Sequence, residues 1–295
     1  MLETIKEYST ICDKLYQDVE QGQNIENWTV SSTKKENISG FYSAILRKDD
    51  KYLIVYRGTN DLMDWVANTT IGFTIRSRQF RLAEEVYKTL LKQCPDKGKI
   101  TLLGHSLGGG LAEFIGANYE IRTYTFNGIG IRHYLKPKIS NQTDFSYINN
   151  YISVVDLVGN LLPHTTTKSY YVYQPENIIH DTEALRQIKD KINLMRKLAT
   201  TIVFASSYFA HKIASIYNSA KDAANKCSIA LLLKLLEIAG VKETFITLTK
   251  QQLVRPIVPV ETAEKEWYRF AHGLQFFIEA RESDIKYLGE NNVLS

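Results

Sequence analysis

The chain has 295 residues, of which 44% are hydrophobic, so it can bury the core of one large domain or of a domain with an addition. Its 36 basic and 32 acidic residues leave a formal charge of only +4, and we expect no nucleic-acid partner. The three widely separated cysteines have no metal-ligand spacing, and their odd number argues against a disulfide framework. The start of the chain carries acidic residues and no apolar signal segment, so we expect a cytoplasmic location or export by a signal-peptide-independent route.

Short apolar runs alternate with longer helical patterns from Ser39 to about Asp156. Two neighbouring strands joined by a turn at Asp49 and Asp50 come first, and a helix ending before Pro95 follows. The expected strands cover 41–47, 51–58, 99–104, 121–128 and 151–156, and the expected helices cover 81–94 and 107–119. Strands that alternate with helices of this length predict an α/β fold with a mostly parallel central sheet and crossover helices.

The alternation of strand and helix patterns ends near Asp181, and long helical patterns then cover 185–217, 223–240 and 261–280. We therefore divide the chain into an α/β core at 1–182 and a helical C-terminal extension or cap at 183–295. The stretch 186–197 has a basic side and an apolar side. We interpret this stretch as a solvated amphipathic helix that packs on the core, and peripheral contact with an anionic membrane is the alternative.

The sequence Gly104-His105-Ser106-Leu107-Gly108 fits the pattern G-x-S-x-G, with a strand pattern before it and a helix pattern after it. This is the setting of a nucleophile elbow, a sharp turn that exposes a serine hydroxyl above a sheet. Bulky residues two positions on either side of the serine would collide with neighbouring backbone. An ordinary glycine-rich turn is the alternative explanation.

A serine nucleophile needs a base, and the base needs a carboxylate to orient it. In an elbow-type sheet these groups follow the serine in the order acid, then histidine. Asp156 ends a strand pattern, so we expect it to be the acid, although it could simply begin a turn. His180 lies just before a helix start and is the expected base, whereas His164 follows Asp156 too closely in the same loop. The other two downstream histidines lie in apolar helical patterns, where packing is the commoner role.

Acyl transfer also needs donors for an oxyanion. The backbone N–H of Leu107, directly after the serine, is the first expected donor. The segment Arg57-Gly58-Thr59 ends an earlier strand, and a tight turn at Gly58 would let the N–H of Thr59 serve as the second. A plain strand-ending turn is the alternative.

Four segments together, "IVYRGTNDLMDW", "ITLLGHSLGGGLA", "TYTFNGIG" and "NYISVVDLVGNLLP", resemble the class 3 lipases, in the form found in bacterial members. The resemblance covers roughly residues 40–185. It implies an α/β-hydrolase fold, carboxylic-ester hydrolysis on a lipid or phospholipid, a Ser106, Asp156 and His180 triad, and an oxyanion hole at Thr59 and Leu107. It also implies a lid near residues 61–80.

We therefore expect a lipase or phospholipase A1 type of serine hydrolase that needs neither a cofactor nor a metal. Two alternatives remain open on the sequence. One is a small-ester carboxylesterase or an acyltransferase, since a triad by itself does not define the acyl acceptor or the substrate. The other is a catalytically silent binding protein on the same fold.

Overall fold

The computed structural model describes residues 1–58, 73–136, 139, 144–153, 156, 158–159, 164–165, 168–172, 273–280 and 285–289. Its helices, in chain order, are α1 (Leu2–Lys14), α3 (Phe73–Gln93), η1 (Lys97–Lys99), α4 (Leu107–Tyr119), η2 (Arg132–Tyr134) and α11 (Gln275–Ile278). Its strands are β1 (Asn24–Ile25), β2 (Trp28–Glu36), β3 (Phe41–Lys48), β4 (Lys51–Tyr56), β5 (Ile100–His105), β6 (Arg122–Phe126), β7 (Ile148–Ser153), β8 (Lys168–Val172) and β9 (Ile285–Gly289).

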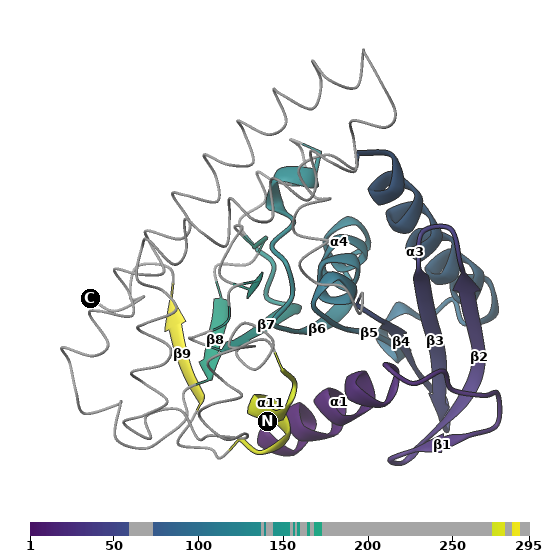
Figure 1. Cartoon of the computed structure of the whole chain (residues 1–295), viewed down its shortest axis with the longest axis horizontal. Helices are drawn as coiled ribbons and strands as arrows, with labels where there is room; N and C mark the ends of the chain where they lie inside the picture. The colour runs from purple at the N-terminus through teal and green to yellow at the C-terminus, as the bar shows by residue number, and fades with distance from the viewer. Residues whose placement is uncertain are drawn as a thin grey trace, which may run out of the picture.

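The described strands form one nine-stranded sheet in which their spatial order is their order along the chain (Figure 1). The strands from β4 to β8 run parallel to one another, and the pairs before β4 and after β8 are antiparallel. The expected α/β fold with parallel central pairing is therefore confirmed, within a mixed sheet. Because the central strands are parallel, the segments that follow β5, β6 and β7 all leave from the same edge of the sheet.

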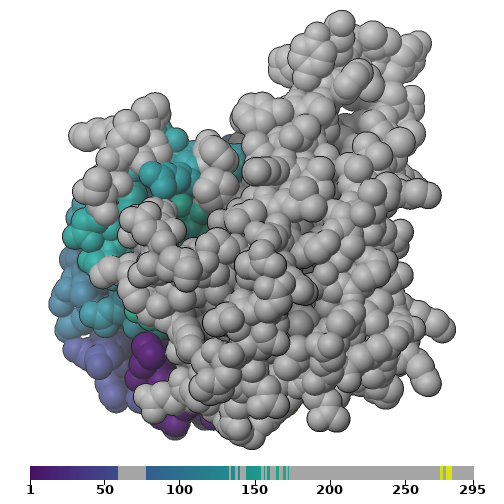
Figure 2. Space-filling view, turned by 90° about the vertical axis from the view of Figure 1, so that its left-hand side faces the viewer, coloured from purple at the N-terminus to yellow at the C-terminus, as the bar shows by residue number. Residues whose placement is uncertain are grey.

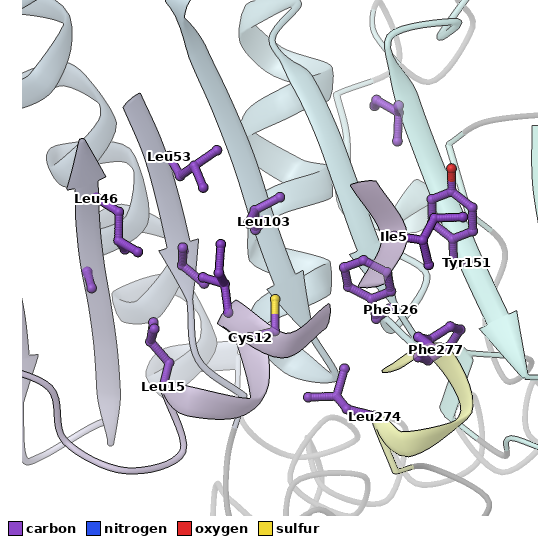
Figure 3. Close-up of a cluster of buried hydrophobic side chains, with 14 of the residues drawn as sticks. Ile5, Cys12, Leu15, Leu46, Leu53, Leu103, Phe126, Tyr151, Leu274 and Phe277 are labelled. Atoms are coloured by element: carbon purple, nitrogen blue, oxygen red, sulfur yellow. The ribbon is translucent and has the colours of Figure 1, made fainter. Parts of the chain in front are cut away.

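The sheet is covered on both faces, which explains why its central strands are apolar throughout. All six residues of β5 are buried, and Leu102 and Leu103 point to opposite faces. Helices α1 and α11 cover one face (Figure 1), where Ile5, Leu103 and Phe277 share a core cluster (Figure 3). Helices α3 and α4 cover the other face. The central strands are thus held between two packed layers.

The amino-terminal helix contacts the antiparallel end of the sheet as well as its centre. The indole of Trp28 on β2 donates to the carboxylate of Glu7 on α1 at 2.9 Å. Figure 2 shows purple atoms of the amino-terminal residues beside blue-violet atoms of the residues that follow them in the chain. Helix α1 therefore links the antiparallel strands to the parallel ones.

The order of elements from β3 to β7 agrees with the sequence prediction, including a turn in which Asp49 adopts a φ of 54°. Two features differ. Helix α3 begins at Phe73 rather than 81, so residues 73–80 of the expected lid belong to it, while 61–72 lie outside the described residues. Strands β1, β2, β8 and β9 were not predicted, and β9 adds a strand to a C-terminal region that was expected to be helical. Most of 183–295 lies outside the described residues, so its division from the core stays a prediction.

Candidate active site

Ser106 occupies the turn between β5 and α4 with a backbone conformation of φ 60° and ψ −128°. A non-glycine residue at positive φ stores strain on the order of 1–3 kcal/mol. Glycines make the turn possible. A Cβ added to Gly104 would lie 2.1 Å from the carbonyl oxygen of Gly108, and one added to Gly108 would lie 2.0 Å from that of Tyr56. Both contacts are with backbone that cannot give way, so the turn has the geometry of a nucleophile elbow.

The backbone around Ser106 is fixed by hydrogen bonds on both sides. Its N–H donates to the carbonyl of Phe126 at 3.2 Å, and its carbonyl accepts from the N–H groups of Gly110 and Ile129 at 3.2 and 3.1 Å. Helix α4 then begins at Leu107, and the N–H groups of a first helical turn have no acceptor within their helix. The serine thus lies where partial positive charge accumulates at the start of a helix.

The side chain of Ser106 is only 1% exposed, although an elbow serine was expected to be open above the sheet. Its hydroxyl has no hydrogen-bond partner among the described residues. Part of the cover comes from the residues just after β4, because a Cβ on Gly58 would lie 2.8 Å from the Cβ of Ser106. A substrate therefore has to gain access to this hydroxyl before it can react.

Gly58 packs between Ser106 and Tyr16, which lies just after helix α1. A Cβ on Gly58 would also lie 2.6 Å from the hydroxyl of Tyr16 and 2.9 Å from the carbonyl of His105. Tyr16 in turn forms a 2.6 Å hydrogen bond with Nδ1 of His105, and burial raises the pKa of its hydroxyl, which keeps it neutral. The end of β4 is thereby brought against the turn that holds Ser106.

Arg57 fixes the end of β4 from the other side. Its guanidinium donates to the carboxylate of Asp18 at 2.9 Å and to the carbonyl of Leu15 at 3.3 Å, and its cationic carbon lies 4.2 Å from the ring centre of Tyr42. The next residue but one, Thr59, lies outside the described residues. Its expected role in the oxyanion hole stays a prediction that the position of Gly58 supports.

Asp156 is fully buried after β7, at the same edge of the sheet as Ser106. A chain of hydrogen bonds joins the two regions through Asn127, which directly follows β6 at a φ of 44°. The N–H of Asn127 donates to the carbonyl of Tyr151, and its side-chain oxygen accepts from the N–H of Ser153 at 2.7 Å. The N–H of Asp156 then donates to the carbonyl of Ser153 at 2.9 Å. The sheet therefore holds the expected nucleophile and the expected acid in one hydrogen-bonded framework.

Both ring nitrogens of His164 are in hydrogen-bond contact with other residues. Its Nδ1 lies 2.7 Å from a carboxylate oxygen of Glu113, and its Nε2 lies 2.9 Å from the carbonyl of Gly159. Sequence reasoning excluded His164 as the base and did not single out Glu113, a charged residue within an otherwise apolar and small-residue helix. A single carboxylate among apolar and small residues was the sequence feature that could have indicated a buried, paired Glu113. His180, the expected base, lies outside the described residues.

Among the residues that the structure describes, no group of three or more histidine, cysteine, aspartate or glutamate side chains is arranged to hold a metal ion. None of the described helices combines the length and apolar character needed to cross a bilayer.

The sheet and the turn at Ser106 define an α/β protein with a strained serine between a strand and a helix. The model of the phospholipase-like family described as the Tle-like phospholipase domain matches residues 11–173, more than half of the chain. The chain therefore belongs to this family and is a lipase/phospholipase-like hydrolase by family. The resemblance to class 3 lipases is confirmed.

A curated relative and several solved structures are also similar. The extracellular phospholipase A1 of Serratia liquefaciens is 32% identical over 96 residues, which make up 32% of this chain and 30% of that protein. A triacylglycerol lipase from Penicillium expansum has a TM-score of 0.44 at 15% identity, over 58% of this chain and 79% of that one. The lipase of Rhizomucor miehei, in its propeptide complex, has a TM-score of 0.42 at 17% identity, over 58% and 68% of the two chains.

Proposed function

We propose that the chain hydrolyses carboxylic esters of lipids, of the lipase or phospholipase A1 type, with Ser106 as nucleophile, His180 as base and Asp156 as the orienting acid. The observation that carries the proposal is the conformation of Ser106. It is held at positive φ between two glycines that admit no side chain, at the start of a helix and at the edge where Asp156 is buried. The family membership and the similarity to a phospholipase A1 point to the same chemistry.

In the proposed reaction, the Ser106 hydroxyl attacks the ester carbonyl and passes its proton to His180. The oxyanion that forms is stabilised by the N–H groups of Leu107 and Thr59. His180 returns the proton to the departing alcohol, which leaves an acyl-enzyme. A water molecule then attacks the acyl group while His180 takes its proton, and the carboxylic acid is released as Ser106 regains a proton. Asp156 keeps the imidazole aligned and stabilises its positive charge.

The proposal is tested by hydrolysis of p-nitrophenyl esters with short and long acyl chains, followed by phospholipid vesicles. The wild-type chain should cleave long-chain esters and release fatty acid from vesicles. Ser106→Ala and His180→Ala should each lose activity by on the order of 10³-fold or more, while His211→Ala serves as the control for a histidine change and retains it. Activity confined to short esters would indicate a carboxylesterase. Wild-type turnover in Ser106→Ala would remove the nucleophile and the proposal with it.

A further inference from the structure

Glu113 is a fully buried carboxylate on α4, two helical turns beyond Ser106 and on the same side of the helix. A buried charge is unfavourable unless it is paired and hydrogen-bonded. One of its oxygens accepts from both the N–H and the hydroxyl of Thr165, at 2.6 and 2.7 Å. The other faces Nδ1 of His164 at 2.7 Å. The proposed triad uses none of these groups, so the cluster requires its own explanation.

The hydrogen bonds of His164 connect this cluster to the acid. A carbonyl can only accept, so we assign a proton to Nε2 of His164, which donates to the carbonyl of Gly159. The N–H of the same Gly159 donates to Oδ2 of Asp156. Both polar groups of one residue are thus engaged, its carbonyl by His164 and its N–H by Asp156. A Cβ on Gly159 would lie 2.9 Å from Oδ2, so this contact also leaves no room for a side chain.

The pair formed by Glu113 and His164 is electrically neutral in this arrangement. The facing carboxylate oxygen and Nδ1 share one proton, since two acceptors at 2.7 Å would otherwise repel each other. The pair therefore fixes Gly159 without placing an uncompensated charge beside the carboxylate of Asp156.

We propose that Glu113 and His164 are positioning residues that hold the carboxylate of Asp156 in its catalytic orientation through Gly159. This inference rests on the proposed function. Ser106 lies at the start of helix α4 and Glu113 lies farther along the same helix. One rigid helix therefore positions the Ser106 hydroxyl and, through the contact of Glu113 with His164, orients the carboxylate of Asp156. A displacement of about 1 Å at a catalytic group can lower the rate on the order of 100-fold.

Two substitutions at one position separate this role from simple charge burial. Glu113→Gln retains the pattern, because its amide oxygen can accept from Thr165 while its NH₂ donates to Nδ1 of neutral His164. Glu113→Leu removes every one of these bonds at similar volume. We expect kcat to remain within about threefold of wild type for Glu113→Gln and to fall about 10- to 100-fold for Glu113→Leu, with KM nearly unchanged. His164→Phe should follow Glu113→Leu.

A control variant corrects for loss of stability. Thr123 is fully buried at the start of β6, away from the catalytic edge, and its hydroxyl donates to the carbonyl of Ile121 at 2.8 Å. Thr123→Val removes a buried hydrogen bond of similar kind, so it should lower the unfolding midpoint while kcat stays at the wild-type level. All variants are assayed well below their unfolding midpoints.

The decisive measurement is a double-variant cycle with Asp156→Ala. If Glu113 acts through Asp156, Glu113→Leu should cost no more than about twofold when Asp156 is already absent. This inference would be overturned if Glu113→Leu lowered kcat by the same factor with Asp156 present and with Asp156→Ala. It would also be overturned if Glu113→Leu kept wild-type kcat while Ser106→Ala is inactive. Either result would leave the proposed function standing. Full activity of Ser106→Ala would overturn both.

Discussion

Gly58 is the position where one added methyl group tests the site most sharply. The Cβ of Gly58→Ala would lie 2.6 Å from the Tyr16 hydroxyl, 2.8 Å from the Cβ of Ser106 and 2.9 Å from the carbonyl of His105. Ordinary van der Waals contact begins at 3.4 Å, so the end of β4 has to move away from Ser106 by about 0.6 Å. The tyrosine ring could shift, but the serine Cβ and the carbonyl belong to the rigid elbow.

The expected effects follow from this displacement. Overpacking of this kind destabilises a fold by about 1–3 kcal/mol. The displaced strand end also carries the expected oxyanion donor at Thr59, and loss of one such donor typically lowers kcat about 100-fold or more. We expect Gly58→Ala to fold, with kcat on a p-nitrophenyl ester reduced at least about tenfold and KM little changed.

Steady-state kinetics combined with urea unfolding separate the two effects. Gly98→Ala is the matched control, since Gly98 lies in η1 before β5 and its Cβ would meet only the Asp96 carboxylate, at 3.1 Å. This control should leave kcat unchanged. The reasoning is refuted if Gly58→Ala keeps wild-type kcat and stability, because the close approach of β4 to Ser106 would then be without consequence.

Three other predictions concern stability and access. The pKa of Glu36 is lowered from 4.5 to about 2, chiefly by the hydroxyl of Ser39, so the stability it contributes is present above pH 4.5 and lost as the pH falls toward 2. The difference in unfolding midpoint between wild type and Glu36→Gln should shrink over that interval; a constant gap would contradict this assignment. Because Ser106 is buried, a fluorophosphonate probe should label it faster with phospholipid vesicles than in buffer, and equal rates would argue that access is already open. Gly108→Ala should lose about 3 kcal/mol or more, measured by urea unfolding, since its Cβ would lie 2.0 Å from a backbone oxygen; wild-type stability would disprove the tight turn.

Local patterns were enough to predict the central part of the fold. The run before Gly104 gave a buried strand, and the glycines around Ser106 gave the turn, because both depend on residues close together in the chain. Strand β9 was missed for the opposite reason. Its five residues pair with β8 across more than 100 positions, and no local pattern indicates such a partner.

The site, like the fold, was predictable where it depends on local sequence patterns. Ser106 and Asp156 were selected from strand ends, and the parallel sheet does place both at one edge. The partners of Glu113 were out of reach of sequence reasoning. A lone carboxylate in a buried helix indicates that a partner exists, but the identity of that partner, His164, depends on how a loop folds back 51 positions away.

Strand β9 has a consequence for how this protein can diversify. Val172 ends β8 and Ile285 begins β9, and these two residues are directly paired. The chain between them therefore departs and returns at a single point, on the edge that also carries Ser106 and Asp156. Closing a loop costs only about 0.6 kcal/mol more for each doubling of its length. Insertions into this segment that spare His180 and α11 can thus be tolerated without altering strand register, so this junction is where relatives can acquire new substrate preferences while Ser106 and Asp156 stay in place.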